Sequence, residues 1–191
     1  NGIVLDPHPA EEAKRFRTIF SRSTRTGSGA PRHEIQCAWS PDGVHWTPQP
    51  ERPVIGSSGG HLGDVSCLFY DPDARLFVQN TRHAGMHSAP VPPHTPPAAR
   101  WGGTTFPHRP DLRRRRRVYQ TCSHDFIHWA EPRLVSAPVS DFDNLDEHHY
   151  GMGQFRVGRH HFATLGVFQH VHNRMEVRLL HGFDGLHFRP L

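Results

Sequence analysis

Short runs of alternating apolar and polar residues recur along the chain and predict β-strands rather than helices. A period of two places one set of side chains on each face of a sheet, as in half-buried strands. The runs fall into three successive groups, each with a first, a second and a third run. First runs span residues 2–6, 64–71 and 150–157, second runs 15–20, 75–80 and 160–165, and third runs 34–39, 117–122 and 175–180. Only residues 9–14 hint at helix, and that segment is short and contains a proline.

Each third run ends in a similar segment, which we call a tag. Tag 1 is Trp39-Ser-Pro-Asp-Gly-Val-His-Trp46, tag 2 is Cys122-Ser-His-Asp-Phe-Ile-His-Trp129 and tag 3 is His181-Gly-Phe-Asp-Gly-Leu-His-Phe188. All share Asp-x-x-His-aromatic, and in two of them glycine follows the aspartate. Asp-Gly between apolar runs predicts a tight turn with a positive φ at glycine, and the aromatic residue begins a short fourth strand. Three copies of such a unit predict four-stranded antiparallel blades of a β-propeller.

The intervals between tags indicate how the blades are distributed. The first interval is longer than the second because of a segment rich in Pro, His and Gly, roughly residues 83–112, without apolar periodicity. We expect a surface insertion there. The whole chain, 1–191, is expected to be a partial propeller with blades at roughly 1–50, 64–133 and 148–191. Closed propellers have at least four blades, so these three predict a piece of a longer protein.

The composition suits a turn-rich all-β domain. Hydrophobic residues make up 35% and charged residues 21%, with 18 prolines and 17 glycines. No run of 18 apolar residues occurs, so no membrane partner is expected. The three cysteines, an odd number without short spacing, favour free thiols over disulfides or a zinc site.

A net charge of +4 and the five arginines at 113–117 suggest binding to a polyanion. No aromatic residues are interleaved with the run, so stacking on bases has no support. The favoured interpretation is a solvated loop end that leads into the strand at Val118, and no nucleic-acid partner is expected.

Eighteen histidines raise the question of a metal site. The adjacent pairs at 148–149 and 160–161 would project from opposite faces of a strand and cannot easily share one ion. His170 and His172 can share a face but lack an obvious third ligand. We therefore expect no metal and no cofactor.

Several segments together resemble bacterial five-bladed propeller proteins related to glycoside hydrolase families 32, 43 and 68, the invertase, arabinanase and levansucrase group. They are residues 1–7, 40–46, 63–64 with 69–72, 123–129 and 150–152. The resemblance covers nearly the whole chain outside the insertion. It implies an all-β five-bladed β-propeller, of which about three blades are present, and a carbohydrate substrate. Sialidase Asp boxes are a rival, but they have one residue between Asp and Gly, whereas Asp42 and Gly43 are adjacent.

The resemblance also implies where acids lie. In these families an Asp opens the first blade, a second Asp stabilises the transition state, and a Glu in the third blade is the general acid. Asp64 opens the second first-run strand and Glu147 lies just ahead of the third. Glycoside hydrolysis commonly needs such a pair of carboxyl groups. The acid of the first blade would lie before Asn1.

Each candidate has a structural alternative. Asp64 also suits a turn after two glycines, and Glu147 also suits a solvated charge in the acidic loop 141–147, where Asp141, Asp143 and Asp146 compete with it. The expected substrate-binding residues are Arg82, Asp146, His149 and Tyr150. Arg82 equally suits a surface ion pair, and His149 and Tyr150 equally suit core packing.

The expected function is therefore that of a glycosidase-like propeller that hydrolyses, or once hydrolysed, glycosidic bonds with paired carboxylates at a central funnel. The alternatives are a non-catalytic carbohydrate-binding propeller and a sialidase-type propeller.

Overall fold

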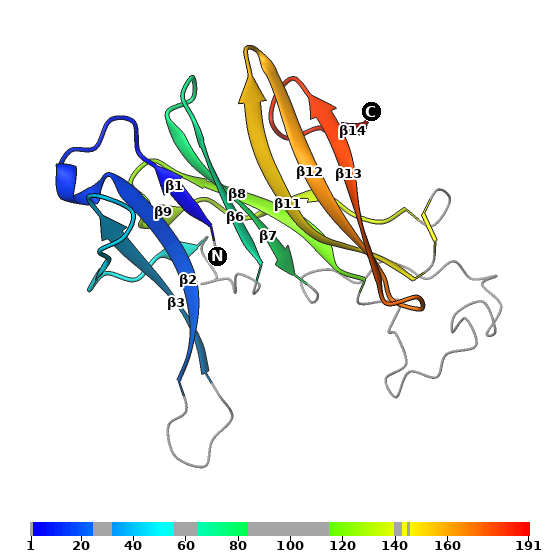
Figure 1. The fold of residues 1–191 in the computed structure, drawn as a ribbon, viewed down its shortest axis with the longest axis horizontal. Coiled ribbons are helices and arrows are strands. Elements are labelled where there is room, and N and C mark those ends of the chain that lie inside the picture. Colours follow the sequence, from blue (N-terminus) through cyan, green and yellow to red (C-terminus); the bar gives the residue numbers. More distant parts are fainter. Residues whose placement is uncertain (1, 25–31, 56–64, 84–114, 140–142, 145) are drawn as a thin grey trace. The chain divides into compact units, whose positions relative to one another are not determined.

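The computed structural model describes residues 2–24, 32–55, 65–83, 115–139, 143–144 and 146–191, and these form β-strands joined by turns (Figure 1). One turn of 3-10 helix, η1 (Glu12–Lys14), occurs where the sequence hinted at helix. The strands are β1 (Ile3–Leu5), β2 (Phe16–Thr24), β3 (Arg32–Ser40), β4 (Thr47–Pro48), β5 (Val54–Ile55), β6 (Ser66–Asp71), β7 (Leu76–His83), β8 (Arg117–Ser123), β9 (His128–Trp129), β10 (Arg133–Ser136), β11 (Glu147–Val157), β12 (His160–Gln169), β13 (Arg174–Gly182) and β14 (Arg189–Pro190).

Three four-stranded sheets follow one another along the chain. Their strand orders are β1-β2-β3-β4, β10-β8-β7-β6 and β11-β12-β13-β14. Neighbours pair antiparallel throughout the first and third sheets, and β6 pairs antiparallel with β7 in the second. A short parallel pair joins β5 to β9. The predicted all-β architecture of four-stranded antiparallel sheets is confirmed.

The chain divides into two compact units. Unit 1 comprises residues 1–81 and 120–133, and unit 2 comprises residues 82–119 and 134–191. Apart from His83, the expected insertion at 83–112 lies outside the described residues. The described part of the chain contains no helix of the length and apolarity that a membrane span needs.

The three tags share one turn geometry. In each, Oδ1 of the aspartate accepts hydrogen bonds from two backbone N–H groups and Oδ2 bonds Nδ1 of the tag histidine. The oxygen–nitrogen distances are 2.9, 2.8 and 2.7 Å in tag 1, 2.8, 2.7 and 2.7 Å in tag 2, and 2.9, 2.8 and 2.6 Å in tag 3. The residue after the aspartate has a positive φ in every copy: 78° at Gly43, 72° at Phe126 and 72° at Gly185. The predicted tight turns with positive φ at glycine are thus confirmed.

Tags 1 and 2 carry two further bonds that tag 3 lacks. The serine that starts the turn, Ser40 or Ser123, bonds the aspartate at 3.0 Å in both. The tag tryptophan donates its indole N–H to the backbone carbonyl of the positive-φ residue, at 3.1 and 3.0 Å. Tag 3 has Gly182 and Phe188 at these positions. A Cβ at Gly182 would lie 2.4 Å from the His187 carbonyl oxygen, so a serine does not fit there without a backbone shift.

Phe126 is the centre of the unit 1 core. Its side chain is fully buried and packs edge-on against Trp39, Phe77 and Trp129, with ring centroids 5.1–5.3 Å apart. The position after the tag aspartate is therefore used differently in tag 2: the backbone keeps the left-handed turn while the ring enters the core. Unit 2 has its own core, formed by Val118, Met152, Ala163, Leu165, Val167 and Leu180.

Replacing Phe126 tests this double role. Phe126→Ala loses the buried ring, which costs about 3–5 kcal/mol, and keeps a Cβ in the left-handed region. Phe126→Gly loses the same ring but relieves a backbone penalty of about 1–2 kcal/mol. We expect urea unfolding to show both variants destabilised, with the alanine variant the less stable. A glycine variant less stable than the alanine variant would contradict this account.

The tags also predict a pH dependence of stability. The hydrogen bond to Asp42 raises the pKa of His45, and the bond to Asp125 raises that of His128. The pKa of each tag aspartate is lowered, at Asp42 chiefly by the His45 side chain and at Asp184 chiefly by the His187 N–H. Burial raises the pKa of Asp125, but the hydrogen bonds it accepts in tag 2 together lower it.

A histidine with a raised pKa stabilises the fold fully below about pH 6.5, and this contribution is lost as pH rises through the folded-state pKa. An aspartate with a lowered pKa stabilises above about pH 3.9, and this contribution is lost as pH falls. We therefore expect His45→Gln and His128→Gln to lower the melting temperature most near pH 5–6 and least near pH 9. The control is His172→Gln, an exposed turn position. Equal losses at both pH values would contradict the linkage.

Candidate functional site

The first strand of the third sheet begins earlier than the sequence predicted. Glu147, His148 and His149 pair with Gln169, Phe168 and Val167, so β11 starts at Glu147 rather than at Tyr150. The candidate acid is therefore the first residue of the strand and not part of the loop before it. Its side chain is buried, with 1% of the residue exposed, so the alternative of a solvated loop charge is wrong.

Both oxygens of the Glu147 carboxylate have a partner within unit 2. Oε1 accepts a hydrogen bond from the Asn144 amide at 2.9 Å, and Oε2 lies 2.8 Å from an Arg178 guanidinium nitrogen. The other terminal nitrogen of Arg178 bonds Asp143, also at 2.8 Å. One guanidinium thus bridges two carboxylates.

Asp143 is held ionised by this arrangement. Burial alone would raise its pKa, but hydrogen bonds from the Val139 N–H and from Arg178 lower it. Because both oxygens of Glu147 accept from donors, a ligand can bond this carboxylate in their place only if a donor moves aside. The Arg178 side chain is 32% exposed, far more than that of Glu147, so it is the partner with room to move.

Arginines 115–117 contribute to the same region. Arg115 donates to the backbone carbonyls of Glu147, at 3.0 Å, and Asn144, at 2.9 Å. Arg115 and Arg117 are only 3% and 4% exposed. The expectation of a solvated arginine run is therefore wrong for these residues, while 113–114 lie outside the described part. Burial lowers the pKa of Arg115, and nearby Asp143 and Glu147 oppose that shift.

Tyr150 lies on a β-bulge. The register between β11 and β12 shifts between His149 and Gly151, so Tyr150 has no direct partner on β12. The guanidinium carbons of Arg82 and Arg116 lie 4.1 and 4.9 Å from the centroid of its ring. These are cation–π distances, and bulges commonly redirect a side chain beside a functional site. The bulge therefore brings an aromatic ring and two cations together next to the start of β11.

The two adjacent histidines have separate surroundings. Nδ1 of His148 accepts the Arg116 N–H at 3.1 Å, and Nδ1 of His149 lies 2.7 Å from the Ser136 hydroxyl. Burial lowers the pKa of both imidazoles to about 4, so they are neutral at pH 7. No group of three His, Cys, Asp or Glu side chains suited to a metal ion occurs among the residues that the structure places.

Asp146 fastens the turn between β12 and β13. Its carboxylate accepts the Val171 N–H at 2.9 Å and its carbonyl accepts the His170 N–H at 3.1 Å. Asp64, the other expected acid, lies outside the described residues. Of the expected site residues, the structure thus places Arg82, Asp146, Glu147, His149 and Tyr150 in unit 2.

Sequence reasoning missed Arg178 and Ser136, the partners of Glu147 and His149. One signal was available for Arg178, because it lies two residues before the core residue Leu180 on β13 and so shares its face of the sheet. A charged residue on a core-facing position needs a buried partner.

Comparison with known proteins finds similar folds only among solved structures. No family model matches the chain, and no curated protein matches it. An N-acetylgalactosamine deacetylase from F. plautii, solved in complex with blood group B trisaccharide, aligns with a TM-score of 0.54 and 14% identity over 92% of this chain and 48% of its own. A mutant GH32 β-fructofuranosidase of Bombyx mori, in complex with sucrose, aligns with a TM-score of 0.54 and 12% identity over 92% of this chain and 32% of its own. The chain spans half or less of each.

At these identities the similarity shows the fold alone. Together with the repeated sheets, it shows that the chain has the fold of part of a glycoside-hydrolase-like propeller.

A double-mutant cycle tests the Glu147–Arg178 pair. Arg178→Met leaves a buried carboxylate without its cation and should cost about 2–4 kcal/mol, below the 3–5 kcal/mol of a fully buried pair because Arg178 is partly exposed. Glu147→Gln should cost less, and the double variant should be more stable than the sum of the single effects predicts, with a coupling of about 1–3 kcal/mol in urea unfolding.

The control is the more exposed pair Arg174–Glu176 on the same strand, whose charged atoms are 3.5 Å apart. Its coupling should be about 0–1 kcal/mol. Equal coupling in the two pairs would show that Arg178 does not hold Glu147.

Proposed function

We propose that this chain is part of a carbohydrate-active propeller that hydrolyses glycosidic bonds, with Glu147 as the general acid and Asp64 as the second carboxylate. The fold similarity supports a glycosidase-like protein, and two structures of similar fold hold saccharides. The observation that carries the proposal is the position of Glu147. It is the first residue of the first strand of the third sheet, where the sequence resemblance expects the acid, and its carboxyl group is buried.

The neighbours of Glu147 have distinct parts in this proposal. Arg178 holds the carboxylate in the free protein and turns to a ligand group when substrate enters. Glu147 then takes up a proton from water and gives it to the glycosidic oxygen as the bond to the leaving sugar breaks. Asp64 stays ionised and stabilises positive charge that develops on the sugar ring. Tyr150, with the Arg82 guanidinium against its ring, offers the sugar an aromatic face. His149 and Asp146, which bond other groups of the protein, hold the chain on either side of Glu147 in place.

A second candidate is a non-catalytic carbohydrate-binding propeller. The bonds of Glu147 favour this candidate. Because Asn144 and Arg178 satisfy both carboxylate oxygens, a structural role is enough to explain this residue. In that case Arg178 and Glu147 are a structural pair.

Substitution of Glu147 distinguishes the two. Glu147→Gln keeps the shape and removes the proton, so hydrolysis of substrates with poor leaving groups should fall by about 10²–10⁴-fold. An activated aryl glycoside, which needs little protonation, should be affected much less. The measurement is kcat/KM of the protein that carries this chain on fructosides, arabinosides, xylosides and galactosides, both natural and aryl.

The matched control is Glu176→Gln, which should leave both rates unchanged. Equal losses on the two substrate types would remove Glu147 from the role of acid. Saccharide binding without hydrolysis in the unmodified protein would favour the second candidate, and absence of both would overturn the proposal.

A further inference from the structure

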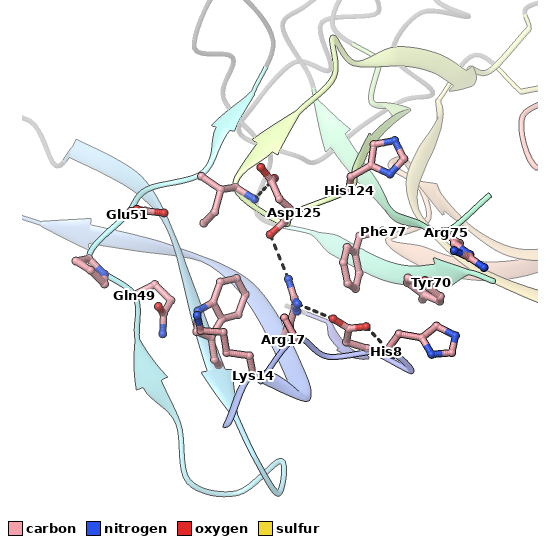
Figure 2. Close-up of a pocket in the computed structure, with 15 residues that line it drawn as sticks. His8, Lys14, Arg17, Gln49, Glu51, Tyr70, Arg75, Phe77, His124 and Asp125 are labelled. Atoms are coloured by element: carbon pink, nitrogen blue, oxygen red, sulfur yellow. Dashed lines mark hydrogen bonds and ion pairs between the residues drawn. The ribbon is translucent and has the colours of Figure 1, made fainter. Parts of the chain in front are cut away.

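Unit 1 contains a cavity of about 510 Å³ that none of the residues discussed for catalysis lines (Figure 2). The first sheet contributes the segment after β1, η1, the start of β2, the end of β3 and the residues after β4. The turn between β6 and β7 and tag 2 complete the walls. All of these belong to unit 1. The volume is within the range of pockets that take small ligands, about 300–1,000 Å³.

The floor of the cavity is a rigid, neutral ion pair. Arg17 bonds the Asp6 carboxylate at 2.5 Å and the Asp125 carbonyl at 3.1 Å, as Figure 2 shows. Its guanidinium carbon also lies 5.0 Å from the ring centroid of Trp39 and 4.8 Å from that of Phe77. Because Asp6 neutralises its charge and its contacts hold it in place, Arg17 forms part of the cavity wall and is not available as a cation for a ligand.

Two other charged groups of the lining already have partners. Lys14 is paired with Glu11 at 2.7 Å, and Asp125 with His128 at 2.7 Å. His8, Arg75 and His124 lie on one side of the cavity in Figure 2, and Glu51 lies on the other side beside Gln49. No described residue bonds the side chains of those three basic residues or the Glu51 carboxylate. The cavity thus has basic donors at one rim and an acceptor at the other.

The backbone of Arg75 has an unusual conformation. Its φ is 53°, in the left-handed region that residues with a Cβ rarely adopt. The turn before it is held by Asp71, whose Oδ1 accepts the N–H groups of Asp73 and Ala74. The same conformation occurs at Gly158 (59°) between β11 and β12 and at Asn173 (48°) between β12 and β13, so here it shapes the hairpin turn that brings Arg75 to the cavity.

We propose that this cavity binds a sugar acid, a pyranose ring that bears one carboxylate. The carboxylate is paired with Arg75, with His8 and His124 as further donors, and the hydroxyl groups on the opposite side of the ring donate to Glu51 and bond Gln49. Half-buried Tyr70 provides the aromatic wall. Arg75 and Glu51 are both exposed. A sugar acid gives Arg75 a charged partner that a neutral sugar lacks, and its hydroxyl groups give Glu51 donors that a simple anion lacks. This inference does not depend on hydrolysis, because every residue it uses is in unit 1.

Binding to the protein that carries this chain is the test, with sodium galacturonate and sodium glucuronate as acidic probes and galactose and glucose as neutral ones. Calorimetric and NMR titrations at 0.15 M salt should show saturable binding of at least one acid, about tenfold or more tighter than its neutral counterpart, since a charge-assisted bond is worth at least that factor. Arg75→Ala should remove this difference, and Ala10→Trp, which fills the cavity from an exposed wall position, should abolish binding.

Arg22→Ala, an exposed arginine on β2, is the matched control and should change nothing. The proposal is overturned if none of the four sugars binds, if acid and neutral forms bind equally, or if Arg22→Ala weakens binding as much as Arg75→Ala. Glu147→Gln should retain the binding, so a failure here is distinguishable from a failure of the proposed hydrolysis.

Discussion

Each tag depends on one carboxylate that replaces the hydrogen bonds a sheet cannot supply at a sharp turn. Buried or constrained backbone N–H groups need acceptors, and the tag aspartate satisfies two of them while binding a histidine with its other oxygen. With the turn closed from the side chain, the next residue is free to differ between copies. In tag 2 that residue is Phe126, which joins Trp39, Phe77 and Trp129 in one core. Arg17 lies against these rings and bonds the carbonyl of Asp125, so the floor of the unit 1 cavity depends on the same turn.

Most of the strands were predictable because their signal is local. Alternation and the repeated tags are properties of neighbouring residues, and the three sheets occur where these patterns lie. The ends of strands were less predictable: β11 begins three residues early because Glu147 to His149 pair with β12, a contact that no local pattern reveals. The hint of helix at 9–14 became a single 3-10 turn, Glu12–Lys14, within the segment that connects β1 to β2.

The candidate site shows where local reasoning ends. Glu147 was found through its place in a repeated unit, whereas its partner Arg178 is distant in sequence and was not. The arginine run has the composition of a solvated segment, yet Arg115 is buried because the carbonyls of Asn144 and Glu147 accept its donors. Burial of a charge depends on partners that the fold assembles, and the residues themselves carry little sign of them. The region beside the start of β11 thus contains buried arginines, an ionised aspartate, Asp143, and two neutral histidines.

The simpler construction of tag 3 has a consequence for local dynamics. A serine hydroxyl and an indole N–H hold the two ends of tags 1 and 2. Gly182 and Phe188 cannot supply these bonds in tag 3, which has the bonds of Asp184 and a longer bond of 3.4 Å from the Gln154 amide to the Gly185 carbonyl. Local opening of a native protein starts where the fewest bonds must break together. The turn of tag 3 should therefore open at a lower free-energy cost than the turns of tags 1 and 2. The amide protons of Leu186 and His187 should exchange with solvent well before their counterparts in tag 2, so tag 3 is the repeat whose turn opens without the rest of its unit.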